Sequence, residues 1–92
     1  MSTTSIDVFD ESSHWELSPQ VSLRDEAFGA LAYHHGNRRL VFLKSRDLVE
    51  LVRRLGDFDN VSAALDELVS SEQRARYVAA LASLHRSGLL SA

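Results

Sequence analysis

The stretch FGALAYHHGNRRLVFL, residues 28–43, holds two apolar runs separated by a turn. Residues 28–34 and 39–43 have the length and the aromatic and aliphatic content of β-strands. Gly36-Asn37 between them suits a two-residue hairpin loop, because such loops need positive φ and both residues tolerate it. The sequence therefore predicts a β-hairpin that turns at residues 36–37.

The turn also fixes which residues of the two strands face each other. Tyr33 is expected opposite Leu40, Leu31 opposite Phe42, and Ala32 opposite Val41. Because strand side chains alternate, one face carries four large apolar side chains and is predicted to face the core: Leu31, Tyr33, Leu40 and Phe42. The other face carries smaller side chains and is predicted to be covered as well or to be open to a partner: Ala30, Ala32, His34, Arg39, Val41 and Leu43.

A short strand is predicted before the hairpin. Val21 and Leu23 alternate with polar residues after Pro19, and Asp25-Glu26 is predicted to form the next turn. The strands of residues 17–43 are then followed by helical patterns in residues 45–88.

Three helices are predicted there. Ser45 is a good N-cap for the first, which stops at Gly56, and the second begins near Asp59-Asn60. Ser70 and Gln73 have the spacing of a capping box at the start of the third, which ends before Gly88. The predicted fold is α+β: a winged-helix-like domain with a three-stranded antiparallel sheet followed by three helices.

Charge divides the chain unevenly. The 92 residues hold 10 Lys and Arg and 13 Asp and Glu, a net charge of −3. Residues 1–16 carry four carboxylates and no Lys or Arg, so we expect a flexible acidic tail there, part of which docks on the domain through Ile6, Val8, Phe9 and Trp15. Residues 17–92 form the predicted domain.

Several classes of function are disfavoured by composition. The chain has no cysteine, no apolar run long enough for a membrane span and no secretory signal pattern, so a cytoplasmic protein without a membrane partner is expected. His34 and His35 are adjacent in a predicted strand and point to opposite faces, which is poor geometry for a metal. No nucleophile elbow or phosphate loop occurs, so we expect no enzyme, no cofactor and no metal.

Nucleic acid remains the main alternative. A winged helix presents its third helix to the major groove, and Arg74 and Arg76 lie near the start of that helix. The helix is otherwise rich in alanine and apolar residues, and the domain offers few phosphate contacts. We therefore expect no nucleic acid partner, and a winged-helix DNA-binding transcriptional regulator stays the alternative function.

Peptide binding fits the second strand of the hairpin better. Residues 39–43 contain no proline and no central charge. If this strand lies at the sheet edge, its free N–H and C=O groups can pair with an incoming strand, and the third helix can wall the groove beside it. The same edge could also pair two copies of the chain.

The sequence also resembles a known family. The segment FGALAYH at residues 28–34, the segment RRLVFLK at residues 38–44, and the ending with Tyr77, Leu81, Leu84 and Ser87-Gly88-Leu89-Leu90 resemble the mycofactocin-system precursor-peptide chaperones. These belong to the RiPP recognition elements and are similar to the pyrroloquinoline-quinone peptide chaperone. The likeness covers about residues 17–91.

The resemblance implies a non-catalytic chaperone without a cofactor. Members of the family bind the leader of a ribosomally made precursor peptide as a strand added to the sheet against the third helix, and deliver it to a radical SAM maturase. Carried over by position, the expected peptide-binding residues are Arg39, Leu40, Val41, Phe42 and Leu43 on the strand and Arg74, Tyr77, Val78, Leu81 and Leu84 on the helix. Val41→Pro is expected to block strand addition.

Overall fold

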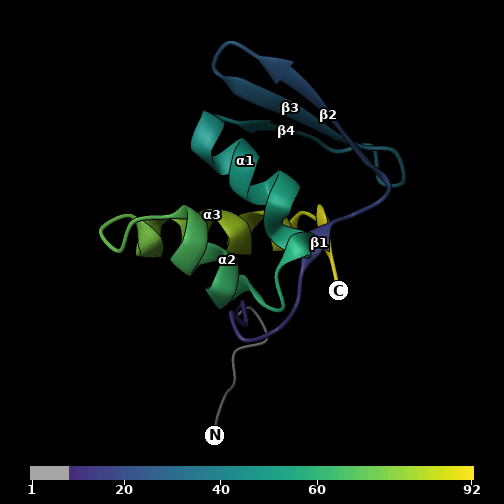
Figure 1. The fold of residues 1–92 in the computed structure, drawn as a ribbon. Helices are drawn as coiled ribbons and strands as arrows, with labels where there is room; N and C mark the ends of the chain where they lie inside the picture. Colours follow the sequence, from purple (N-terminus) through teal and green to yellow (C-terminus); the bar gives the residue numbers. More distant parts are fainter. Residues whose placement is uncertain (1–8) are drawn as a thin grey trace, which may run out of the picture.

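A three-stranded antiparallel sheet lies over three helices in the computed structural model, which describes residues 9–92 (Figure 1). In chain order the elements are β1 Glu16–Leu17, β2 Val21–Glu26, β3 Gly29–His34, β4 Leu40–Leu43, α1 Arg46–Arg54, the 3₁₀ turn η1 Leu55–Asp57, α2 Val61–Leu68, α3 Arg74–Arg86 and β5 Leu90–Ser91. The sheet has the order β2-β3-β4, and β1 pairs with β5 in a separate small sheet. The predicted α+β order of three strands and three helices is confirmed.

The predicted register of the hairpin is also confirmed. Tyr33 pairs with Leu40, Leu31 with Phe42 and Ala32 with Val41. The turn between the strands differs from the prediction, because neither Gly36 nor Asn37 has positive φ and Arg38 takes the left-handed conformation at φ 64°. His34 still donates its N–H to the Arg39 carbonyl at 2.9 Å, so the longer loop of residues 35–38 closes the same register.

The predicted turn at Asp25-Glu26 is wrong. Strand β2 continues through both residues, with Asp25 opposite Ala30 and Glu26 opposite Gly29, and the turn falls at residues 27–28. Gly29 makes this possible, since its φ of 152° suits glycine and an added Cβ would clash with the Leu43 carbonyl.

The predicted core face of the sheet is wrong as well. Ala30, Ala32 and Leu43 are buried on one face, whereas Leu40 and Phe42 on the other are 58% and 54% exposed. Helix α1 follows β4 after only two residues and packs on the face of Leu43, where the small side chains of β3 allow a close approach. Alternation predicts two faces, and the position of α1 decides which one is the core.

The helices begin largely where capping residues predict. The side chains of Ser45 and Asn60 accept from the N–H groups of Leu48 and Ala63 at 3.0 and 2.8 Å, and each caps its helix. The predicted capping box before α3 does not form, because Gln73 itself is the N-cap and makes no side-chain cap. Gly88 has φ 82°, as predicted for the end of α3.

The segment before β1 lies partly on the folded body. Phe9 is 7% exposed within the core, and Trp15 packs against the same cluster, as expected for docking side chains. Residues 1–8 of the predicted acidic tail lie outside the described residues.

Candidate functional site

Strand β4 has a free edge. It pairs with β3 on one side, and no strand within residues 9–92 pairs with its other side. In an antiparallel pair of strands, every second residue directs its N–H and C=O groups toward the neighbouring strand. The His34 N–H donates to the Arg39 carbonyl, so Val41 and Leu43 also direct their N–H and C=O groups toward β3. Leu40 and Phe42 therefore direct their backbone groups away from the sheet.

Helix α3 runs beside this edge and is tied to both ends of β4. Near the start of the helix, the Tyr77 hydroxyl lies 3.4 Å from Ser45 Oγ, just after β4. At the other end, Asn37 donates from Nδ2 to the Ser87 carbonyl at 3.3 Å, just before β4. A hollow of about 140 Å³ lies where β4, α1 and α3 meet, lined by Lys44, Ser45, Leu48, Arg76, Tyr77 and Ala80.

The structure brings together only part of the predicted site. Leu40 and Phe42 lie on the exposed side of β4, and Val41 is half-buried. Leu43, Leu81 and Leu84 are core residues, exposed by 1%, 0% and 5%, so they support the strand and the helix rather than line an open groove. Tyr77 is the predicted helix residue whose side chain borders the hollow.

Arg74 and Val78 lie on a different side of α3 from Tyr77. Residues of an α-helix are about 100° apart, which places Arg74 and Val78 nearly opposite Arg76 and Ala80. Arg74 and Val78 line another hollow, of about 420 Å³, together with Glu11, Ser71 and Ala75. Arg74 and Val78 thus do not border the hollow beside β4, and their contact with an added strand stays a prediction.

Arg74 is occupied within the chain. Its guanidinium donates to Asp66 at 2.6 Å, to Ser62 at 2.8 Å and to Glu11 at 3.1 Å. The hydrogen bond to Asp66 is the main reason that the pKa of Arg74 lies above its usual range. Arg74 thus ties the segment before β1 to α2 and α3.

Residues missed by the sequence reasoning are Lys44, Leu48, Arg76 and Ala80 at the hollow and Phe28 on the sheet. Arg76 and Ala80 are four residues apart, so the helical period places them on one face and would have found them. Lys44 directly follows the predicted strand in the RRLVFLK segment.

The hairpin concentrates positive charge in an acidic protein. Residues 27–46 contain Arg38, Arg39, Lys44 and Arg46 and no carboxylate, a charge of +4. The whole chain carries −3, so the remaining residues carry −7. None of the ion pairs formed within residues 9–92 involves these four cations. The charge around β4 would attract an anionic partner.

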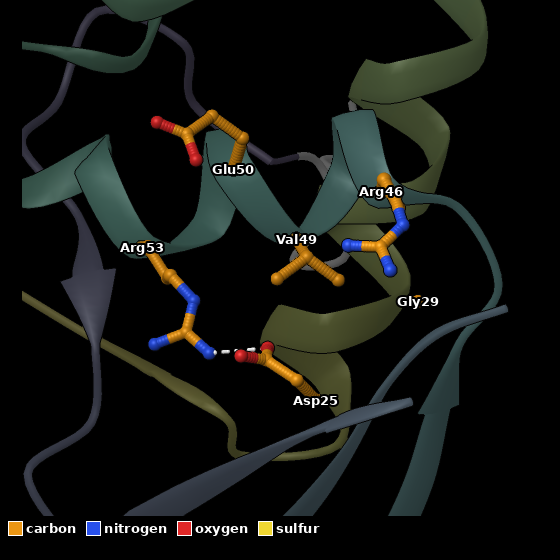
Figure 2. Close-up of a pocket in the computed structure, with 6 residues that line it drawn as sticks. All are labelled: Asp25, Gly29, Arg46, Val49, Glu50 and Arg53. Carbon is orange, nitrogen blue, oxygen red and sulfur yellow. Dashed lines mark hydrogen bonds and ion pairs between the residues drawn. The ribbon is translucent and has the colours of Figure 1, made fainter. Parts of the chain in front are cut away.

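A second polar hollow lies between α1 and the turn of β2 and β3 (Figure 2). It measures about 220 Å³ and is lined by Asp25, Gly29, Arg46, Val49, Glu50 and Arg53. Arg53 Nη2 donates to Asp25 Oδ1 at 2.7 Å across it. This bond joins α1 to β2, and within residues 9–92 it is the one hydrogen bond or ion pair between the side chains that line the hollow (Figure 2).

Within residues 9–92, no three histidine or acidic side chains cluster in a way that could hold a metal ion. None of the helices in the same residues has the length and apolarity to cross a membrane.

Comparisons with known proteins agree on one family. The model of the Peptide chaperone MftB family matches residues 14–91. The chain is 45% identical over 83 residues to the peptide chaperone MftB of Mycolicibacterium smegmatis, covering 89% of this chain and 81% of that protein. It is 42% identical over 83 residues to the namesake of Mycobacterium ulcerans, covering 89% and 76% of the two chains.

The protein of the same name from Mycobacterium tuberculosis is 46% identical over 56 residues, which cover 61% of this chain and 51% of that protein. No solved structure matches the chain. These relatives carry the name of chaperones and not of enzymes, in agreement with the expectation of a non-catalytic protein. The family match spans both β4 and α3, and the chain belongs to the Peptide chaperone MftB family.

Proposed function

We propose that this protein binds the leader of a mycofactocin-system precursor peptide as an added β-strand and presents it to a radical SAM maturase. The observation that carries the proposal is the free edge of β4, where the N–H and C=O groups of Leu40 and Phe42 point away from β3. An extended peptide that pairs with these groups gains affinity from backbone hydrogen bonds and selectivity from alternate side chains.

The surroundings of the edge support an acidic guest with a side chain that enters a small hollow. Helix α3 stands beside β4, and the hollow at its start has the apolar Leu48 and Ala80 next to the cations Lys44 and Arg76. Arg38 and Arg39 precede the strand without ion pairs in the described part of the chain. Opposite charge speeds encounter and helps to set register.

The register names the substitution that tests the proposal. Phe42→Pro removes an N–H that points outward and leaves the bonds between β3 and β4 intact, since proline is tolerated at an edge. The variant is expected to fold and to lose at least about tenfold in affinity for the leader. It lacks one backbone N–H donor for the added strand, and the proline ring obstructs the close approach of that strand. Isothermal titration calorimetry with the synthetic leader measures this.

Two controls separate the causes. Phe42→Ala keeps the N–H and removes only the aromatic ring, so it should bind the leader better than Phe42→Pro does. Val41→Pro removes an N–H that pairs with Ala32, so it should lower the melting temperature, which corrects the expectation from sequence that Val41 is the blocking position. Leader affinity in folded Phe42→Pro equal to that of the unmodified protein would contradict strand addition.

The alternative of a DNA-binding regulator has less support. Of the two arginines expected to contact DNA near the start of α3, Arg74 donates its hydrogen bonds within the chain, to Asp66, Glu11 and Ser62. A titration with duplex DNA in the same calorimeter distinguishes the two functions.

A further inference from the structure

The outer face of the sheet exposes a group of large apolar side chains. Phe28, Leu40 and Phe42 are 47%, 58% and 54% exposed, and they are the exposed large apolar side chains of residues 9–92. The rings of Phe28 and Phe42 meet edge to face with centroids 5.9 Å apart. Leu31 and Tyr33 lie on the same face of the sheet, opposite Phe42 and Leu40. We call these five residues the outer patch.

The outer patch has no cover in the described structure. Helix α1 packs on the opposite face of the sheet, and α2 and α3 lie on that same side (Figure 1). A hollow of about 350 Å³ on the outer patch is lined by Phe28, Phe42 and Lys44. Contiguous exposed apolar surface of this kind marks interaction sites in soluble proteins.

A peptide added to β4 would leave much of the outer patch open. Strands of a sheet are about 4.8 Å apart, so a guest strand lies beside β4 in the plane of the sheet. Phe28 belongs to the turn between β2 and β3, on the far side of β4 from that guest. The outer patch therefore needs an occupant other than the strand that pairs with the edge.

The charge around the outer patch selects that occupant. Lys44 borders the hollow on this face and forms no ion pair within residues 9–92, whereas the exposed Arg24 of the same face is paired with Glu26 at 2.8 Å. A second copy of the chain, packed symmetrically on this face, would bring the same positive charge against itself. A partner with an apolar surface edged by carboxylates complements both properties.

We infer that the outer patch is the surface on which the maturase docks, through an apolar area rimmed by acidic side chains. This inference rests on the proposed function, in which the maturase receives the peptide from β4. The guest would then lie at the border of the contact, next to Leu40 and Phe42, and the enzyme would touch both the chaperone and the peptide.

Phe28→Ser tests the inference, because Phe28 lies outside the edge that binds the peptide. The variant should bind the precursor peptide as the unmodified protein does and bind the purified maturase at least about tenfold more weakly, as expected for an aromatic residue central to an interface. Ala27→Ser, an exposed neighbour in the same turn, is the matched control and should bind both partners normally.

Arg24→Glu provides a second variant that does not depend on how Phe28→Ser folds. Arg24 lies opposite Leu31 with its side chain 79% exposed and is paired with Glu26 at 2.8 Å, so the change removes that pair and places a second carboxylate beside Glu26 on the outer face. It should weaken maturase binding severalfold in low salt and leave peptide binding intact.

Maturase binding that is unchanged in both variants would overturn the inference and leave the proposed function in place. Failure of the unmodified protein to bind either the peptide or the maturase would overturn both. Binding of anionic phospholipid vesicles or duplex DNA that depends on Phe28, with no such dependence for the maturase, would also overturn the inference.

Discussion

At the scale of single residues, Gly29 illustrates how one position joins two distant segments. A Cβ added at Gly29 would clash with the Leu43 carbonyl oxygen and lie 3.0 Å from the Ser45 nitrogen. The backbone of Gly29 is therefore packed closely against both residues. It therefore couples the turn of β2 and β3 to the end of β4 and the cap of α1. No sequence pattern indicates this contact, because the partners are fourteen or more residues apart and only the folded hairpin brings them together.

Gly29→Ala is predicted to destabilise the fold by roughly 2–4 kcal/mol, from a strained φ and a backbone clash. Thermal unfolding followed by circular dichroism measures the loss. Gly36→Ala is the comparison variant, since φ of Gly36 is not positive and the nearest atoms to an added Cβ belong to the side chains of Gln20 and His34 rather than to the backbone. Equal melting temperatures for Gly29→Ala and the unmodified protein would contradict this role of Gly29.

Arg74 shows where sequence reasoning ends at this scale. The helical pattern places it correctly near the start of α3, as its first residue. Its carboxylate partners Glu11 and Asp66 come from the segment before β1 and from α2. This long-range pairing of Arg74 depends on packing that periodicity cannot reveal.

At the scale of elements, the strand order and register followed from the hairpin sequence, and the buried face did not. The predicted pairs of Tyr33 with Leu40 and Leu31 with Phe42 are those of the structure. Size alone suggested that these large side chains form the core. The short connection from β4 to α1 instead places the helix over Ala30 and Ala32, which leaves Leu40 and Phe42 exposed.

The predicted groove stays a prediction, and the structure places its side chains differently from one another. Helix α3 lies beside the free edge of β4, and Tyr77 borders the hollow between them. Leu81 and Leu84 face the core, because the second apolar side of α3 packs within the domain.

At the scale of the whole molecule, charge separation should govern how the leader reaches the edge. The four cations of residues 27–46 stand out in a chain with a net charge of −3. Opposite charges act over a Debye length of about 10 Å at 0.1 M salt and only about 3 Å at 1 M. Residues 1–16 contribute four carboxylates, and no Lys or Arg, to the negative charge of the rest of the chain.

The affinity for an acidic leader is therefore predicted to fall severalfold as salt rises from about 0.1 M to about 1 M. Fluorescence anisotropy with a labelled leader measures it over that range. Arg39→Gln should reduce the salt dependence, and Arg86→Gln, an exposed arginine outside the hairpin, should preserve it. Salt-independent binding of the unmodified protein would contradict electrostatic attraction by the hairpin.

Amide hydrogen exchange of β4, followed by NMR, tests the free edge most directly. Without peptide, the amides of Leu40 and Phe42 should exchange rapidly, and those of Val41 and Leu43, which pair with β3, should be protected. At saturating leader, exchange at Leu40 and Phe42 should slow by at least about tenfold. Protection of Leu40 and Phe42 in the free protein, or exchange unchanged by bound leader, would contradict strand addition at this edge.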